Sequence, residues 1–251
     1  MFDLSGRTIV VTGGNGGIGL GLARGVARAG AQVAIWARNP EKSERAKGEL
    51  EALGAKVLAL SCDVANEQEI LRAIETTSGH FGRIDACFAN AGYGAPGDPL
   101  TISLEACRVL MSVNLAGSFF TLPCVAHPMI SHGFAVRLLA VSSMVEHFAS
   151  PMQTHYAASK AAVGSLVRSL AVRLARYDIQ VNSLEPGWIK TDATAGAVNS
   201  SRMNEVLMKR TPARRWGETR DFEGIAVYLA ADESAYHTGD AIRIDGGYTV
   251  F

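Results

Sequence analysis

Short apolar runs rich in β-branched residues alternate with longer amphipathic stretches from one end of the chain to the other. This alternation is typical of strands joined by helices in a parallel α/β sheet. The charged stretch 41–53 has the pattern of a helix on the outside of such a sheet. We therefore expect a doubly wound α/β fold, with strands near residues 7–12, 32–37, 56–60, 84–89, 135–141, 179–184 and 241–244.

The domain organisation follows from the same pattern. No repeat, low-complexity tract or Pro/Ser-rich linker interrupts it, which predicts a single domain over residues 1–251. Segment 187–218 departs from it, because this segment is richer in polar and small residues and ends in the basic run 209–215. We expect this segment to be a lid over a substrate site. A solvent-exposed loop on the protein surface explains the basic residues of this segment equally well.

The composition narrows the classes of function. With 251 residues, 48% of them hydrophobic and 19% charged, the chain can bury the core of one α/β domain. The 24 Lys and Arg residues balance the 24 Asp and Glu residues, so we expect no nucleic-acid or membrane partner. The four cysteines lack metal-type spacing, no metal-ligand cluster is visible, and no stretch approaches the roughly 18 apolar residues of a membrane span. These features predict a cytoplasmic protein without a metal.

A glycine-rich turn follows the first predicted strand and leads directly into a helical pattern. It comprises Thr12 to Gly19, with Gly13, Asn15, Gly17, Ile18 and Gly19 as the predicted contact residues. A turn with few side chains lets the backbone approach a pyrophosphate, whose charge is met by the free N–H groups of the helix start. A tight structural turn explains many such matches, but the strand before and the helix after favour a dinucleotide site.

The end of the second strand bears on the choice of cofactor. NAD-binding folds of this kind place an acidic residue there, to bind the ribose hydroxyls. This chain has Arg38 instead, in Ile35-Trp36-Ala37-Arg38-Asn39. A guanidinium suits the 2′-phosphate of NADP(H), which we favour over NAD(H). Arg38 could instead stack on the adenine or face solvent.

Tyr156 and Lys160 are candidates for acid–base chemistry. A spacing of four places both side chains on one helix face. A phenol has an ordinary pKa of about 10, and a neighbouring cation is expected to lower it toward neutrality. Taken alone, such a pair usually lies at a surface, so the assignment depends on the other motifs.

The ordered set of motifs resembles the short-chain dehydrogenase/reductase family of about 250 residues, in its 3-oxoacyl reductase or ketoreductase-like branch. The resemblance runs nearly end to end. Its elements are Thr12 to Gly19, Asp63-Val64, Asn90-Ala91-Gly92, Asn114, Ser143, Tyr156 with Lys160, Pro186-Gly187 with Thr191, and Asp245-Gly246-Gly247.

The resemblance implies an NAD(P)-dependent oxidoreductase with a Rossmann-like domain and a mostly parallel seven-stranded sheet. It implies hydride transfer between nicotinamide and a carbonyl or secondary alcohol, with Tyr156 exchanging the proton and Ser143 steadying the substrate oxygen. Ser142 competes with Ser143 but is off by one position. Lys160 would also bind the nicotinamide ribose, and Asn114 would hold a water that resupplies the proton. The remaining implied cofactor contacts are Asp63, Val64, Asn90, Ala91, Gly92, Pro186, Gly187, Ile189 and Thr191.

The substrate is less constrained by the sequence. The expected pocket, formed by residues 93–97, 144–147, Gln153, Trp188 and 192–215, is mostly uncharged, which favours a neutral or aromatic ketone. Sugar-acid and acyl-thioester substrates stay open. Glu146 and His147 follow Ser143 closely enough to offer a pH-dependent substrate contact, although loop histidines are usually solvated.

Two further expectations concern the protein as a whole. Relatives of this kind commonly form homotetramers, and the apolar helices around 101–130 and 156–175 could supply the contact surface. The alternative to an enzyme is a catalytically silent protein that senses dinucleotides and acts through a partner. The presence of all four members of the catalytic set, Asn114, Ser143, Tyr156 and Lys160, favours the enzyme.

Overall fold

The computed structural model describes all residues 1–251, and its seven strands form one parallel sheet in the order β3-β2-β1-β4-β5-β6-β7. The seven strands predicted from the sequence are confirmed, with ends within two residues. They are β1 Thr8–Thr12, β2 Gln32–Ala37, β3 Val57–Ser61, β4 Ala86–Ala89, β5 Arg137–Val141, β6 Gln180–Pro186 and β7 Ala241–Ile244.

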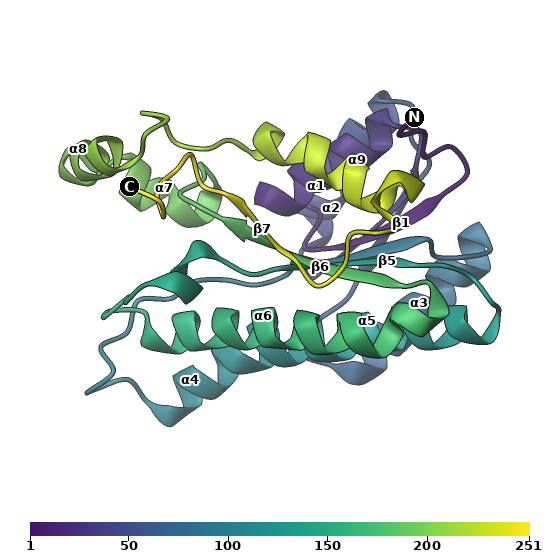
Figure 1. The fold of residues 1–251 in the computed structure, drawn as a ribbon, viewed down its shortest axis with the longest axis horizontal. Helices are drawn as coiled ribbons and strands as arrows, with labels where there is room; N and C mark the ends of the chain where they lie inside the picture. Colours follow the sequence, from purple (N-terminus) through teal and green to yellow (C-terminus); the bar gives the residue numbers. More distant parts are fainter.

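Helices cover both faces of the sheet (Figure 1). One layer contains α1 Gly17–Arg28, α2 Pro40–Ala52 and α9 Glu223–Ala230. The opposite layer contains α3 Glu67–Phe81, α4 Leu104–Met111, α5 Gly117–Ser131 and α6 Thr154–Leu174. Two short helices, α7 Ala195–Val198 and α8 Ser201–Arg210, lie beyond the end of β6 and outside both layers (Figure 1).

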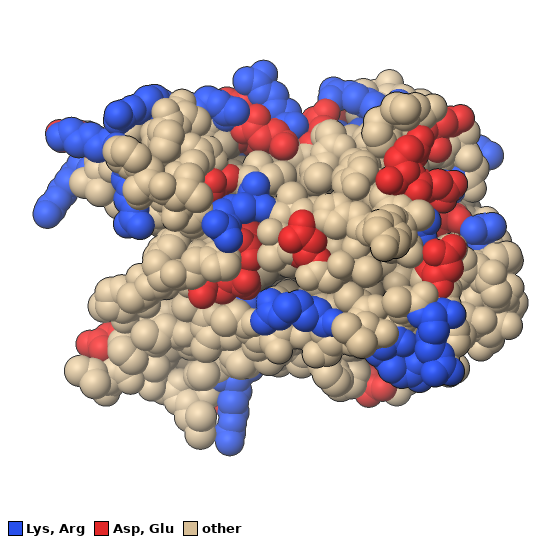
Figure 2. Space-filling view, viewed as in Figure 1, with Lys and Arg blue, Asp and Glu red and all other residues tan.

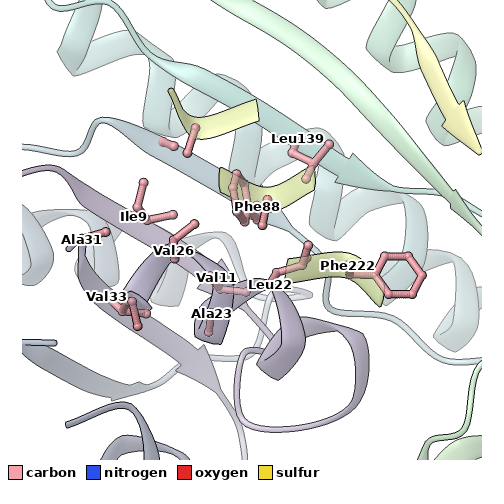
Figure 3. Packing of buried hydrophobic residues seen from close by; sticks show 14 of the residues in the cluster. Ile9, Val11, Leu22, Ala23, Val26, Ala31, Val33, Phe88, Leu139 and Phe222 are labelled. Atoms are coloured by element: carbon pink, nitrogen blue, oxygen red, sulfur yellow. The ribbon is translucent and has the colours of Figure 1, made fainter. Parts of the chain in front are cut away.

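The strands are apolar on both sides because each face of the sheet packs against a helical layer. Along β1, Ile9 and Val11 belong to the core beneath α1, whereas Val10 belongs to the core on the opposite face. Figure 3 shows the first of these cores, where Leu22 and Val26 of α1 pack over β1. This two-sided burial explains the continuous apolar runs from which the strands were predicted.

Local signals set the ends of the outer helices. Asn39 caps α2 by accepting a hydrogen bond from the backbone N–H of Lys42, and Pro40 occupies the first helical position. Asn66 caps α3 in the same way, and α3 ends at Gly82, whose φ of +88° is left-handed. These caps hold α2 and α3 against the sheet edge that contains β2 and β3.

The helices α4 and α5 are joined without a break by a π-helical turn, Ser112–Ala116. Within the combined segment Leu104–Ser131, an 18-residue window has a mean hydropathy of 1.7, and by length and composition the segment could cross a membrane. The sequence analysis expected no apolar stretch long enough to span a membrane. That expectation was wrong, because α4 and α5 join into one continuous apolar helix. Half of that window is buried, with α5 packed against α3 and β4, as expected also for a helix in the core of a folded layer.

The strand order reverses beside β1, because β2 lies on one side of it and β4 on the other. Parallel sheets open a crevice at the carboxyl ends of the strands at such a point, and ligands bind there. The turn after β1, the loop after β4 and the turn after β5 all reach this edge. The fold thus brings the glycine-rich turn, Gly92 and Ser143 to one edge.

The contact between α1 and α9 depends on glycine. A Cβ at Gly25 would collide with the backbone carbonyl of Glu223, which cannot move aside as a flexible side chain would. We predict that Gly25→Ala lowers the free energy of unfolding by about 1–3 kcal/mol, although alanine is the better helix former. Denaturant titration measures the change. The matched control is Gly48→Ala in α2, where nothing lies within 4 Å of the added methyl group, and which we expect to be neutral or stabilising. Equal effects of the two substitutions would contradict the proposed packing.

Candidate active site

A cleft of about 730 Å³ opens at the carboxyl edge of the sheet. All predicted site residues line it except Gly19 and Asn114, which lie behind its wall. Those that line it are Gly13, Asn15, Gly17, Ile18, Arg38, Asp63, Val64, Asn90, Ala91, Gly92, Ser143, Tyr156, Lys160, Pro186, Gly187, Ile189 and Thr191. Their roles stay predictions, but the structure places them around one cavity.

The glycine-rich turn is held open by backbone geometry and by the loop after β4. Gly13 and Gly17 have φ values of +64° and +52°, a region that favours glycine. Thr12 Oγ1 accepts hydrogen bonds from the backbone N–H groups of Asn90 and Ala91, each at 2.9 Å. A Cβ at Gly13 would lie 3.0 Å from Asn90 Nδ2. The turn is therefore fixed in a shape that leaves the start of α1 without a side-chain cap, as a bound phosphate requires.

Two cations lie at the end of the cleft beside β2. The Arg38 side chain is 68% exposed, and its Nη1 lies 3.8 Å from Asp63 Oδ2. Lys42, which the sequence analysis missed, lines the same end, and its Nζ donates to Asp192 Oδ2 at 2.7 Å. The signal that could have found Lys42 is its position in the first turn of the helix that begins directly after Arg38.

The catalytic candidates meet at the centre of the cleft. Ser143 follows β5, Tyr156 and Lys160 lie one turn apart on α6, and the Ser143 hydroxyl lies near enough to the Tyr156 phenol to act on its pKa, in the lowering direction. Ser142, the competing serine, points elsewhere, with its Oγ 2.9 Å from the Lys160 carbonyl and 2.7 Å from Glu146 Oε2. The structure thus favours Ser143, whose hydroxyl contacts Tyr156.

Lys160 is 5% exposed, and its Nζ donates to the carbonyl of Val141, the last residue of β5, at 2.7 Å. Burial lowers the pKa of Lys160 to about 8. Burial also raises the pKa of Tyr156, and the hydrogen bond from Ser143 acts in the opposite, lowering direction. This direction is opposite to the one expected from the sequence. The physical reason is that Lys160 is bound to Val141, 5.9 Å from the Tyr156 ring centre, while the phenol loses water contacts.

Asn114 lies within the π-helical turn and is fully buried. Its Oδ1 accepts from the backbone N–H of Tyr93 at 3.0 Å, and its Nδ2 donates to the Tyr93 carbonyl at 2.9 Å and to Ser159 Oγ at 3.2 Å. A Cβ at Gly92 would lie 3.1 Å from Asn114 Oδ1 and 3.4 Å from Lys160 Nζ. Asn114 thus joins the loop after β4 to α6, and its water-holding role stays a prediction.

The expected substrate pocket is present in part. Tyr93, Gly94, Met144, Val145, Gln153 and Trp188 line the cleft, together with Asp192, Ala193, Thr194, Ala197 and Met203 from the expected lid. Glu146 and His147 do not line it. Figure 2 shows that the hollow below α8 is bordered mainly by uncharged side chains.

Behind the cleft wall, the structure brings together an ionisable cluster that the sequence did not reveal. Glu146, His147 and Glu185 offer oxygen and nitrogen atoms within 4.8 Å of one another, a spacing at which such groups can hold a metal ion. Arg243 Nε donates to Glu185 Oε2 at 2.9 Å, so a guanidinium already supplies positive charge here. No such cluster is visible in the sequence, because His147 and Glu185 are 38 positions apart, and the absence of a metal stays a prediction.

The lowered pKa of Lys160 makes stability depend on pH. Because the unfolded lysine keeps its ordinary pKa of about 10.4, the buried ammonium destabilises the fold fully below pH 8, and stability rises between pH 8 and about 10.4. We predict that Lys160→Met raises the free energy of unfolding at pH 7 by about 1–2 kcal/mol. This value already includes the cost of leaving the Val141 carbonyl without its hydrogen-bond donor. The gain shrinks as the pH rises toward 10.4. Thermal unfolding measures it, with the exposed Lys209→Met as control. If the stability difference between Lys160→Met and wild type did not vary with pH, the lowered pKa of Lys160 would be contradicted.

Comparison with known proteins agrees with the geometry. The family model described as enoyl-(acyl carrier protein) reductase matches residues 13–249. L-rhamnose 1-dehydrogenase (NAD(P)(+)) from a Sphingomonas species is 36% identical, over 98% of this chain and 98% of its own. Gluconate 5-dehydrogenase from Gluconobacter oxydans is 34% identical, over 100% of this chain and 97% of its own.

A solved structure extends the likeness to the fold. The crystal structure of a gluconate 5-dehydrogenase from Burkholderia cenocepacia, in complex with NADP and tartrate, has a TM-score of 0.94 and 35% identity, over 100% of this chain and 98% of its own. These full-length relatives are named as dehydrogenases, which confirms the enzyme interpretation over the silent alternative. The chain therefore belongs to the short-chain dehydrogenase/reductase family, a family of oxidoreductases, as its motifs predicted.

Proposed function

We propose that the chain is an NADP(H)-dependent oxidoreductase that interconverts a carbonyl and a secondary alcohol. The observation that carries this proposal is that the hydroxyls of Ser143 and Tyr156 line the same cleft as the buried Lys160 ammonium, which is fixed by its bond to the Val141 carbonyl. A pair of hydroxyls beside a fixed cation suits the exchange of a proton with an oxygen that gains or loses charge.

The residues present fit a dinucleotide. The glycine-rich turn leaves backbone N–H groups free at the start of α1, and Gly13 and Gly17 keep side chains out of the approach. Arg38 and Lys42 add two positive charges at the other end, where a 2′-phosphate would bind. Pro186, Gly187, Ile189 and Thr191 border the opposite side. When bound, NADP(H) supplies the hydride that this chain's side chains cannot supply.

The protein's own residues handle the proton. In reduction the Tyr156 hydroxyl donates a proton to the substrate oxygen, and in oxidation the phenolate takes it back. Ser143 donates a hydrogen bond to the same oxygen. Because Ser143 lies next to Tyr156, the two hydroxyls together fix the position of the substrate oxygen. The Ser143 hydroxyl acts to lower the Tyr156 pKa, against the larger, raising effect of burial.

The substrate end of the cleft favours an uncharged molecule. Lys160 is the one cation among the lining residues there, while Arg38 and Lys42 lie at the adenosine end. The Trp188 Nε1 donor is buried without a partner in the protein, and Gln153 adds an amide. These groups suit the hydroxyls of a neutral sugar or hydroxyketone better than a carboxylate. This supports a neutral sugar as substrate, like the L-rhamnose in the name of one relative, over gluconate, which is in the name of another.

The segment 187–218 supports the lid prediction, because it includes α7 and α8 and contributes Ala197 and Met203 to the cleft. A homo-oligomer is supported by apolar side chains that α4 and α5 leave exposed, among them Leu104 at 64% and Phe119 at 52%. The tetrameric state and the cytoplasmic location stay predictions.

Replacement of the phenol tests the reaction. We predict that Tyr156→Phe lowers kcat by about 100-fold or more, because the proton donor is lost while the ring still packs. The measurement follows NADPH oxidation with uncharged ketoses and hydroxyketones, and NADP⁺ reduction with L-rhamnose and gluconate. The fully exposed Tyr236→Phe is the matched control.

Two results would contradict the proposed function. An undiminished rate in Tyr156→Phe would remove this residue from the mechanism. A kcat/KM for gluconate above that for every uncharged sugar and ketone would overturn the assignment of a neutral substrate.

The cations beside β2 determine the cofactor preference in this proposal. We predict that Arg38→Ala lowers kcat/KM for NADPH by about 10- to 100-fold, the value of one charge-assisted contact, and changes kcat/KM for NADH much less. Lys42→Ala should act in the same direction but less strongly, since Asp192 already neutralises part of its charge. Steady-state kinetics with both cofactors measures the effect, with Lys47→Ala as control. A wild type that prefers NADH would show that Arg38 does not bind a 2′-phosphate.

A further inference from the structure

Two buried carboxyl groups lie side by side behind the cleft wall, with an oxygen of each within 4.8 Å of the other. Glu146 lies on the helical turn Met144–His147 that follows Ser143, and Glu185 lies at the carboxyl end of β6, before Pro186 and Gly187. The Glu185 side chain is fully buried, and the Glu146 side chain is 9% exposed. Two buried carboxyl groups at this separation repel each other when both are ionised, so we expect one of them to carry a proton.

The donors around Glu185 show where that proton lies. Glu185 Oε2 accepts from Arg243 Nε at 2.9 Å and lies 2.7 Å from His147 Nε2, which itself lies 3.1 Å from Arg243 Nη2. Glu185 Oε1 is buried and has no N–H or hydroxyl partner. A buried carboxylate oxygen without a donor is costly, and the acid proton of Glu146 is the donor that the structure leaves for it.

The pKa values of the two groups agree with this assignment. Burial, together with the hydrogen bond to Glu185, raises the pKa of Glu146 to about 7. Burial also acts to raise the pKa of Glu185, but hydrogen bonds from Glu146, Arg243 and His147 together hold it below the usual value. The titratable and charged groups that surround Glu146 are Glu185 on β6, Arg243 on β7, His147 on its own turn, and Tyr156 and Lys160 on α6.

Glu146 is connected to the catalytic groups through Ser142. The Ser142 hydroxyl has one proton and two acceptors, Glu146 Oε2 at 2.7 Å and the Lys160 carbonyl at 2.9 Å. An anionic Glu146 competes for this proton more strongly than a neutral one does. Loss of the Glu146 proton therefore weakens the bond from Ser142 to α6 and places two negative charges side by side next to the turn that carries Ser143.

The helix α6 has a glycine where the Glu146 carboxyl lies against it. A Cβ at Gly164 would lie 2.8 Å from Glu146 Oε2 and 3.1 Å from Oε1. A glycine inside a helix costs about 1 kcal/mol relative to alanine, and here it provides the space that the carboxyl occupies. The position offers a way to displace the carboxyl without changing any charge.

We propose that Glu146 is a positioning residue that, as a neutral acid hydrogen-bonded to Glu185, holds the Ser143 turn against β6 and α6 in the active geometry. The residue acts through Ser142 and Ser143 and does not touch the substrate. This inference rests on the proposed oxidoreductase function. Loss of the Glu146 proton makes the enzyme less stable and slower.

The stability of the fold tests the shared proton without any need for turnover. Because the Glu146 pKa is raised in the folded state, its contribution to stability is fully present below its ordinary pKa of about 4.3, and is lost as the pH rises through about 7. Wild type should therefore lose stability relative to Glu146→Gln between pH 5 and pH 8, since the amide stays neutral. Thermal unfolding across this range measures the difference, with Glu75→Gln on exposed α3 as the matched control. Parallel curves for wild type and Glu146→Gln would overturn the proposal.

Kinetics test the positioning role. We expect kcat of wild type, divided by kcat of Glu146→Gln, to fall severalfold, up to about tenfold, between pH 6 and pH 8, as one proton is lost. The effects of pH on Tyr156 and Lys160 are common to wild type and Glu146→Gln, so they cancel in this ratio. Gly164→Ala should fold, because only the flexible end of Glu146 must move, and it should lose the same pH dependence. A constant ratio, or a Gly164→Ala variant with the wild-type profile, would overturn the proposal.

The two readouts separate the failure of this inference from the failure of the proposed function. A wild type that turns over no carbonyl with NADPH removes the proposed function and with it the kinetic role, and the unfolding curves still decide whether the proton is shared. Turnover with a constant kcat ratio removes the positioning role alone.

Discussion

The buried ammonium of Lys160 is the interaction on which the geometry of the site depends. A charge at 5% exposure is costly unless fixed dipoles compensate it, and the carbonyl of Val141 at the end of β5 does so at 2.7 Å. That bond fixes the register of α6 against the sheet. Tyr156 lies one turn earlier on the same helix and Ser143 lies two residues beyond Val141, so one bond positions the whole reactive group. Gly92 lies against the same group, because a Cβ there would contact Lys160 Nζ at 3.4 Å and lie tightly, at 3.1 Å, against Asn114 Oδ1.

The parallel sheet explains why residues far apart in sequence converge on this lysine. Every strand ends at the same edge, so the loop after β4, the turn after β5 and the end of β6 meet there. The two-sided burial that produces the continuous apolar strands also excludes water from beneath the cleft. The core and the shifted pKa of Lys160 therefore have a common cause, the helical layers on both faces.

Much of the fold could be predicted from the sequence, because its signals are local. The seven strands appear as apolar runs, and the glycine-rich turn and the Tyr156 and Lys160 spacing lie within single elements. The contacts between Glu146 and Glu185 could not be predicted, since they join a turn and a strand end whose proximity only the folded sheet creates. The direction of the Tyr156 pKa was wrong because spacing shows that a cation is near but not that it binds a carbonyl instead. The length of the apolar segment 104–131 was underestimated, because the π-helical turn that joins α4 and α5 into one continuous helix leaves no local signal in the sequence.

The charges of the site fall into two sets that differ in solvent exposure, and exposure decides what each set can do. Arg38 and Lys42 are 68% and 44% exposed, so they keep a fixed charge and can bind an anion at small desolvation cost. Lys160, Glu146 and Glu185 are buried, so their protonation responds strongly to their partners. Selection of the cofactor therefore belongs to the exposed set and changes little with pH. Reactivity belongs to the buried set, in which burial raises the pKa of Glu146 and lowers that of Lys160, so both shifts favour the neutral form of the group.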